Sequence, residues 1–161
     1  MASNTNVSPS SVVIDANVVI ALCANELEKV ASADAKIKEY SANGCRFFTP
    51  GVLVAECLYV FCRKLKDGVL TPVEHYAAVQ ALAVMMGAID PPPNGDRSLI
   101  KRAEEIRGVL GCSRSADGIY LALADELAQT SITEVLTFDT GMTSQAAALA
   151  LTPKVVVLPT A

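Results

Sequence analysis

The stretch from Ser11 to Asn17 (SVVIDAN) constrains the fold most, because a run of apolar β-branched residues ends abruptly in a carboxylate. Val12, Val13 and Ile14 suit a strand that is buried on both faces. Asp15 would then lie at the carboxyl end of that strand. In open α/β sheets this is the edge at which ligands bind, so the stretch predicts a polar site there.

Patterns typical of strands and of helices alternate along the rest of the chain. Further strands are predicted at 45–48, 134–138 and 154–158, with a short candidate at 88–90 before three prolines. Helices are predicted at 18–23, 26–42, 50–66, 72–86, 96–110 and 142–151, and a further helix that ends near 129 is capped by Ser113 or by Ser115. This alternation predicts a three-layer α/β/α fold with a mostly parallel sheet of about five strands.

Two of the predicted helices have clear starting signals. Thr49 is expected to cap the helix that follows, with Pro50 at its first position. Thr71 precedes Pro72, and Glu74 completes the pattern of a capping box. Since the helices that begin at these two points follow each other directly, we expect them to form a hairpin.

The length of 161 residues and the apolar share of 52% fit one domain, which we place at 12–161 after a disordered tail at 1–11. The net charge of −4 argues against a broad basic face for nucleic acid. Five cysteines without a Cys-x-x-Cys pair indicate buried thiols rather than disulfides or zinc. Without a signal peptide or a membrane-spanning run, the protein is expected in the cytoplasm.

Four acidic residues stand within or directly after apolar sequence: Asp15, Glu56, Asp117 and Asp139. Glu56 is the most informative, because apolar residues surround it on both sides in the predicted helix. A buried carboxylate without a partner is costly, so Glu56 implies a cation, a hydrogen-bond donor or a raised pKa. Together the four acids predict a pocket that binds a hard divalent cation through carboxylate oxygens.

Each acid also has a purely structural interpretation. Asp15 can cap the helix that follows it, and Asp117 is favoured by the helix dipole in a first turn. Asp139 precedes a Thr-Gly pair, where an aspartate commonly bonds to its own backbone. Glu56 can form an ion pair with Arg63. The basic residues before Asp117, among them Arg114, can likewise be an ordinary solvated surface instead of a phosphate contact.

Four motifs in this order make the sequence resemble the PIN-domain ribonucleases over nearly the whole chain from Val12. They are Val-Val-Ile-Asp15-Ala-Asn17, Val54-Ala-Glu56, Ser115-Ala-Asp117-Gly-Ile-Tyr-Leu-Ala-Leu-Ala124 and Leu136-Thr-Phe-Asp139. The chain looks most like the small single-domain members typified by VapC toxins of toxin–antitoxin pairs. In these proteins a parallel sheet carries four metal-binding acids.

The resemblance implies that Asp15, Glu56, Asp117 and Asp139 bind metal, with Asn17 and Thr137 as supporting polar groups. It implies a ribonuclease that uses Mg²⁺ or Mn²⁺, a homodimer, and a small antitoxin protein as a partner. Arg114 and Ser115, near the start of a helix, are expected to meet substrate phosphate. Gly118 departs from the family pattern, because many relatives have alanine at that position.

Two other functions remain as alternatives. A phosphatase of the haloacid dehalogenase type also places an aspartate after the first strand. Such enzymes need a second aspartate two residues later, where this chain has Asn17. A PIN scaffold that binds a protein or RNA without cleaving it is the second alternative, since a fold does not guarantee an activity.

Overall fold

Parallel strands form the centre of the computed structural model, which describes residues 8–112 and 116–161. The strands of the described part are β1 (Ser11–Ile14), β2 (Arg46–Phe48), β3 (Thr133–Thr137) and β4 (Lys154–Val157). Their spatial order is β2-β1-β3-β4, and every neighbouring pair is parallel. The connections from β1 and β3 therefore run in opposite directions, so the carboxyl ends of β1 and β3 flank the switch point at which sheets of this kind bind ligands.

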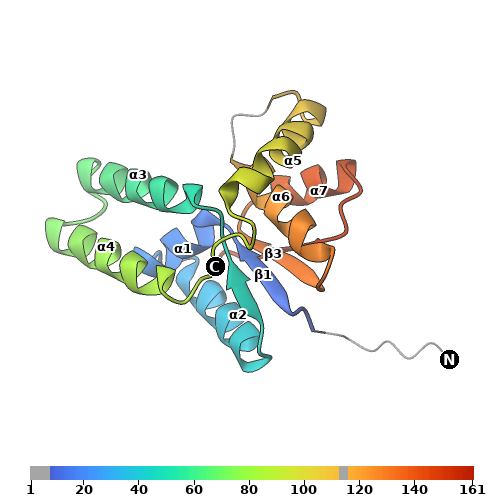
Figure 1. The fold of residues 1–161 in the computed structure, drawn as a ribbon. Coiled ribbons are helices and arrows are strands. Elements are labelled where there is room, and N and C mark those ends of the chain that lie inside the picture. Colours follow the sequence, from blue (N-terminus) through green and yellow to red (C-terminus); the bar gives the residue numbers. More distant parts are fainter. Residues whose placement is uncertain (1–7, 113–115) are drawn as a thin grey trace.

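Helices cover both faces of this sheet, as the sequence predicted. Figure 1 shows α1 and α2 on one side of the strands and α6 and α7 on the other. The hairpin of α3 and α4 projects beside α1, and α5 packs on α6. The helices are α1 (Ala16–Cys23), α2 (Val30–Ala42), α3 (Val52–Lys66), α4 (Pro72–Met86), α5 (Asp96–Val109), α6 (Asp117–Ala128) and α7 (Thr140–Ala148).

The three-layer α/β/α class is confirmed, with a sheet of four strands where about five were expected. The segment at 88–90 supplies only an isolated bridge between Asp90 and Phe48. Proline has no backbone N–H for a ladder, so the three prolines after Asp90 end the pairing there. β1 begins at Ser11, one residue before the predicted domain boundary.

The predicted start of α4 is confirmed, whereas that of α3 is wrong. Thr71 and Glu74 form a complete capping box at α4. The buried Thr49 does not cap α3, because its hydroxyl donates to the carbonyl oxygen of Ile14 at 3.2 Å. Gly51 precedes α3, and its backbone N–H donates to Asp96 Oδ1 at 2.9 Å. The segment before α3 is thus held by two contacts, one from Thr49 to β1 and one from Gly51 to α5.

One cluster of buried apolar side chains joins the sheet to both helical layers in the described part of the chain. Val12, Val13 and Val135 are completely buried, as expected for strands that are covered on both faces. Within residues 8–112 and 116–161, no helix combines the length and the apolar character that crossing a membrane requires.

Candidate active site

Asp15 lies at the carboxyl end of β1, where the sequence placed it, and only 7% of the residue is exposed. Its Oδ2 accepts a hydrogen bond from the hydroxyl of Thr137 at 2.6 Å. Asp15 occupies the N-cap position of α1, yet its side chain makes no capping hydrogen bond there. The capping interpretation of this residue is therefore wrong.

Thr137 and Asn17 form a hydrogen-bond network that fixes the orientation of Asp15. Thr137 Oγ1 accepts from Asn17 Nδ2 at 3.1 Å and from the backbone N–H of Asp139 at 2.9 Å. Asn17 Oδ1 accepts from the backbone N–H of Phe138 at 3.1 Å, which determines which way the amide points. Since the Thr137 oxygen already accepts twice, its one proton is directed to Asp15.

Glu56 lies in the second turn of α3 and faces α6. Its Oε2 accepts a hydrogen bond from the hydroxyl of Tyr120 at 2.6 Å. The predicted alternative, an ion pair with Arg63, is wrong, because Arg63 approaches Asp67 at 3.8 Å. Glu56 is half-buried and its helix neighbour Tyr59 is 63% exposed, so the setting is more open than the apolar sequence indicated.

Asp117 is the first residue of α6, and its Oδ2 accepts from Gln145 Nε2 of α7 at 2.8 Å. Gly118 follows it and is buried against α5. A Cβ atom at this position would lie 3.0 Å from Arg107 Cγ and 3.2 Å from the carbonyl oxygen of Ala103. The departure from alanine at Gly118 therefore allows α5 to lie close to the start of α6, next to Asp117.

The charges of these three acids act on one another. The pKa of Asp15 is raised to about 6, chiefly by burial and in addition by the charges of Asp117 and Glu56, against the opposing effect of the Thr137 hydrogen bond. Burial also raises the pKa of Glu56, against the Tyr120 hydrogen bond and with the help of Asp117. In the described part of the chain, no lysine or arginine compensates Asp15 or Glu56.

Asp139 differs from the other three acids. It is exposed, it precedes α7 as the N-cap residue, and its Oδ1 accepts from the backbone N–H of Gly141 at 2.7 Å. The sequence anticipated this use as the alternative to metal binding. Asp139 is nevertheless tied to the site through its backbone, which donates to Thr137.

The acids suit a divalent cation in their chemistry, because carboxylate oxygens are the preferred ligands of Mg²⁺ and Mn²⁺. Asp15 and Glu56 receive neutral hydroxyl donors, and a cation would relieve the repulsion among the three charges. Within residues 8–112 and 116–161, however, no group of three or more His, Cys, Asp or Glu side chains is gathered closely enough to hold an ion. Shared coordination would require the carboxylates to draw together.

The predicted phosphate contacts Arg114 and Ser115 lie outside the described residues. Several of the other basic side chains are occupied in ion pairs. Lys64 approaches Glu26 at 2.7 Å, and Arg102 donates to Asp125 at 2.8 Å. Arg102, one of the basic residues before Asp117, therefore belongs to the ordinary charged surface, and Lys64 is likewise paired.

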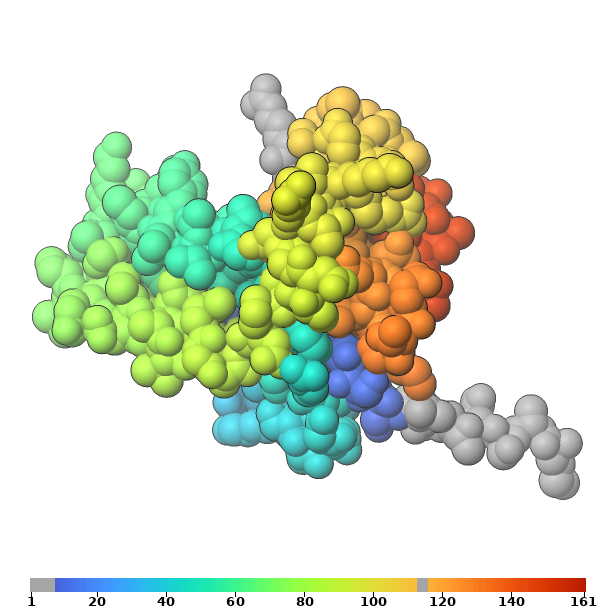
Figure 2. Space-filling model, viewed as in Figure 1, coloured from blue at the N-terminus to red at the C-terminus, as the bar shows by residue number. Residues whose placement is uncertain are grey.

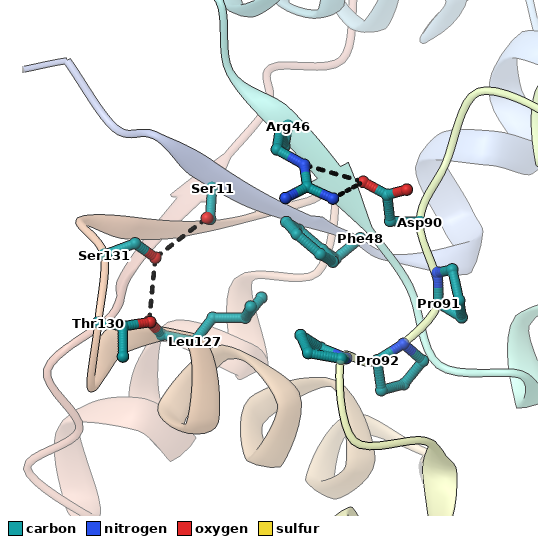
Figure 3. A pocket seen from close by; sticks show the side chains of 10 residues that line it. Ser11, Arg46, Phe48, Asp90, Pro91, Pro92, Leu127, Thr130 and Ser131 are labelled. Atoms are coloured by element: carbon teal, nitrogen blue, oxygen red, sulfur yellow. Dashed lines mark hydrogen bonds and ion pairs between the residues drawn. The ribbon is translucent and has the colours of Figure 1, made fainter.

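A separate pocket of about 480 Å³ lies beside β2 and the start of β1 (Figure 3). Arg46 donates to Asp90 Oδ2 through two nitrogens, at 2.8 and 3.1 Å, and stacks over the ring of Phe48. Pro92 also lines this pocket. None of the predicted acids lines it, and Asp90 already neutralises its arginine, so its chemistry differs from that of the acid site.

The sequence did not identify Tyr120 and Gln145 as members of the site. For Tyr120 a signal existed, because it lies three residues after Asp117 on the same face of α6, and a buried tyrosine hydroxyl needs a partner. Burial and Glu56 raise the pKa of Tyr120, so its hydroxyl keeps its proton and acts as a donor. For Gln145 no local signal existed, because its partner lies in another helix.

The sheet is parallel, and Asp15 and Asp139 follow its two central strands, β1 and β3. These features define a class of α/β proteins that bind ligands at the carboxyl ends of their strands. The PIN domain family model matches residues 12–148, which is most of the chain. The protein therefore belongs to the PIN domain family, whose members are generally nucleases. No curated protein matches the chain.

Proposed function

We propose that this protein is an endoribonuclease that hydrolyses RNA phosphodiester bonds and uses Mg²⁺ or Mn²⁺ as its cofactor. The observation that carries the proposal is the grouping of Asp15, Glu56 and Asp117, whose charges act on one another. The pKa values of Asp15 and Glu56 are raised by burial, and raised pKa values at buried or half-buried acids are typical of functional sites. Membership of a family that generally consists of nucleases supports the same reaction class.

Asp15, Glu56 and Asp117 are the residues we assign to hold the ion, and Asp139 to hold a second ion or to orient the attacking water. When bound, a divalent cation supplies charge neutralisation for the phosphate and lowers the pKa of the attacking water. Thr137 keeps Asp15 in one orientation, with Oδ2 engaged. Asn17 supports that contact from α1.

Glu56 is the residue we assign to take the proton from the attacking water. Its Oε2 is occupied by the Tyr120 hydroxyl, so Oε1 is the atom that accepts the proton. A general base works best when its pKa lies near the working pH, and burial moves the pKa of Glu56 upward in that direction. Arg114 and Ser115, which stand shortly before α6 in the sequence, are assigned to substrate phosphate.

We further propose a VapC-type toxin that acts in the cytoplasm, with a small antitoxin protein as partner. The support is the resemblance of the four acidic motifs to those toxins.

A homodimer is also proposed. Its support is an apolar stripe along α4, formed by Val73, Tyr76 and Val84, which are 77%, 66% and 79% exposed. Figure 2 shows the α3–α4 hairpin projecting from the body of the molecule.

A catalytically inert PIN scaffold that binds RNA or a protein is the second candidate. The observation in its favour is that the acids in the described residues are not gathered closely enough to share an ion. The two candidates differ in one measurement. Cleavage of a labelled single-stranded RNA is expected in millimolar Mn²⁺, and it should stop on chelation and in Asp15→Asn. RNA binding by the wild type without any cleavage in Mg²⁺ or Mn²⁺ would instead support the scaffold.

A further inference from the structure

Gln145 is a polar side chain at the acid site that has no role in the proposed reaction. It projects from α7, and its Nε2 donates to Asp117 Oδ2 at 2.8 Å. The other end of the amide is unusual, because Oε1 is buried and accepts no hydrogen bond within the described part of the chain. Most buried side-chain oxygens have a partner, so this one calls for an explanation.

The orientation of the Gln145 amide follows from its contact with Asp117. Rotating the amide by half a turn would place its oxygen against the carboxylate oxygen at 2.8 Å, where two acceptors repel each other. The amide nitrogen must therefore face Asp117 as long as the carboxylate is ionised. Oε1 consequently stays in a buried position where it accepts no hydrogen bond from the described residues.

Packing alone does not explain this arrangement. A methionine has nearly the same length and shape as glutamine and would fill the same space without burying an acceptor that lacks a donor. A glutamine at this position costs stability through Oε1, and within the described residues it gains one hydrogen bond in exchange. That gain is the hydrogen bond that fixes Asp117 from outside its own helix.

We propose that Gln145 is a positioning residue, which fixes the carboxylate of Asp117 for its part in the reaction. This inference rests on the proposed nuclease function. Thr137 holds Asp15, Tyr120 holds Glu56, and Gln145 completes the set by holding Asp117. Asp15, Glu56 and Asp117 thus each accept a hydrogen bond from a neutral side chain in another element of the fold. Residues that orient ligand side chains in this way typically change metal affinity or activity by about 10–100-fold when they are replaced.

The test compares Gln145→Met with Gln129→Met, a matched control at the exposed end of α6 whose side chain donates to the backbone oxygen of Asp125. For each protein, the melting temperature is measured without metal and in a titration with MnCl₂. Cleavage of a labelled single-stranded RNA then gives kcat and KM. We expect the metal-free melting temperature of Gln145→Met to equal or exceed that of the wild type, since the buried acceptor is gone.

The Mn²⁺ concentration that gives half of the stabilisation should rise about tenfold or more in Gln145→Met. The value of kcat should fall by a similar factor, while KM stays within about twofold. Gln129→Met should match the wild type in every measurement. An unchanged Mn²⁺ midpoint and kcat in Gln145→Met, with an active wild type, would overturn the positioning role alone.

Lower activity together with a lower metal-free melting temperature would assign Gln145 to packing and also overturn the inference. If the wild type neither responds to Mn²⁺ nor cleaves RNA, the proposed function itself fails, and the role of Gln145 fails with it. The measurements on the wild type therefore distinguish a failure of the nuclease proposal from a failure of the positioning role of Gln145.

Discussion

At the scale of the residue, the buried charge of Asp15 makes the metal-free protein less stable near neutral pH. The folded pKa of about 6 exceeds the ordinary value of 3.8, so the folded state binds a proton more tightly than the unfolded state does. Stability is then highest below pH 4 as far as this group is concerned, and it is lost as the pH rises towards 6. The difference corresponds to about 3 kcal/mol.

We therefore predict that Asp15→Asn, which keeps the shape but not the charge, lacks this loss. Between pH 3 and pH 7, the free energy of unfolding of the variant should gain about 3 kcal/mol relative to the wild type. Urea denaturation of both proteins in chelator at the two pH values measures the difference, in which titrating groups that do not interact with Asp15 cancel. A difference that does not change with pH would show that the Asp15 carboxyl has its ordinary pKa.

Glu56→Gln gives a second prediction for a single side chain. The amide can still accept the Tyr120 hydrogen bond, and removing the charge relieves repulsion with Asp117, so metal-free stability should hold or rise. RNA cleavage should be abolished, because an amide cannot take the proton from water. Chemical denaturation without metal, paired with a cleavage assay in Mn²⁺, tests both parts. A variant that is active but less stable would contradict the assignment.

At the scale of the element, local signals were sufficient where a helix start depends only on its own residues. The capping box of Thr71 and Glu74 is such a case. Thr49 carried the same kind of signal, but its hydroxyl bonds to a strand carbonyl 35 residues away. The sequence could not reveal that contact, because it depends on how α3 is placed against β1.

The same distinction applies to the site. Asp15 and Thr137 could be located from the sequence, because each lies at or near the end of a recognisable strand. The contact between Gln145 and Asp117 joins two helices that are separated by β3, so it follows only from their packing. Glu56 is less buried than the apolar run around it indicated, because α3 belongs to a projecting hairpin.

The exposed stripe on α4 gives a prediction for that helix. If α4 forms a homodimer interface, Val84→Lys should weaken the dimer, because it places a charge where apolar surface must be buried. The fold should be unaffected, since Val84 is 79% exposed in the single chain. Ile100→Lys on α5, at a residue that is 64% exposed, is the matched control.

Sedimentation velocity at micromolar concentration distinguishes the outcomes. The wild type and Ile100→Lys should sediment as dimers, and Val84→Lys should shift towards the 16.9 kDa monomer. A wild type that is entirely monomeric at this concentration would argue against the interface.

At the scale of the whole molecule, the three interacting acids Asp15, Glu56 and Asp117 come from separate elements of the fold. Asp15 follows β1, Glu56 belongs to α3, and Asp117 begins α6, so their mutual repulsion opposes the packing of these three elements. An ion that binds them only when they are together must therefore stabilise the whole fold. In the described residues the carboxylates are not gathered into one metal site, so metal binding should also draw them closer.

The melting temperature as a function of divalent metal is the most direct test of the claim that these acids form one metal site. Millimolar Mn²⁺ or Mg²⁺ should raise the melting temperature of the wild type, and chelator should reverse the increase. The same additions should leave Asp15→Asn much less affected. Heating curves of the wild type that superimpose with metal and with chelator would contradict a shared metal site.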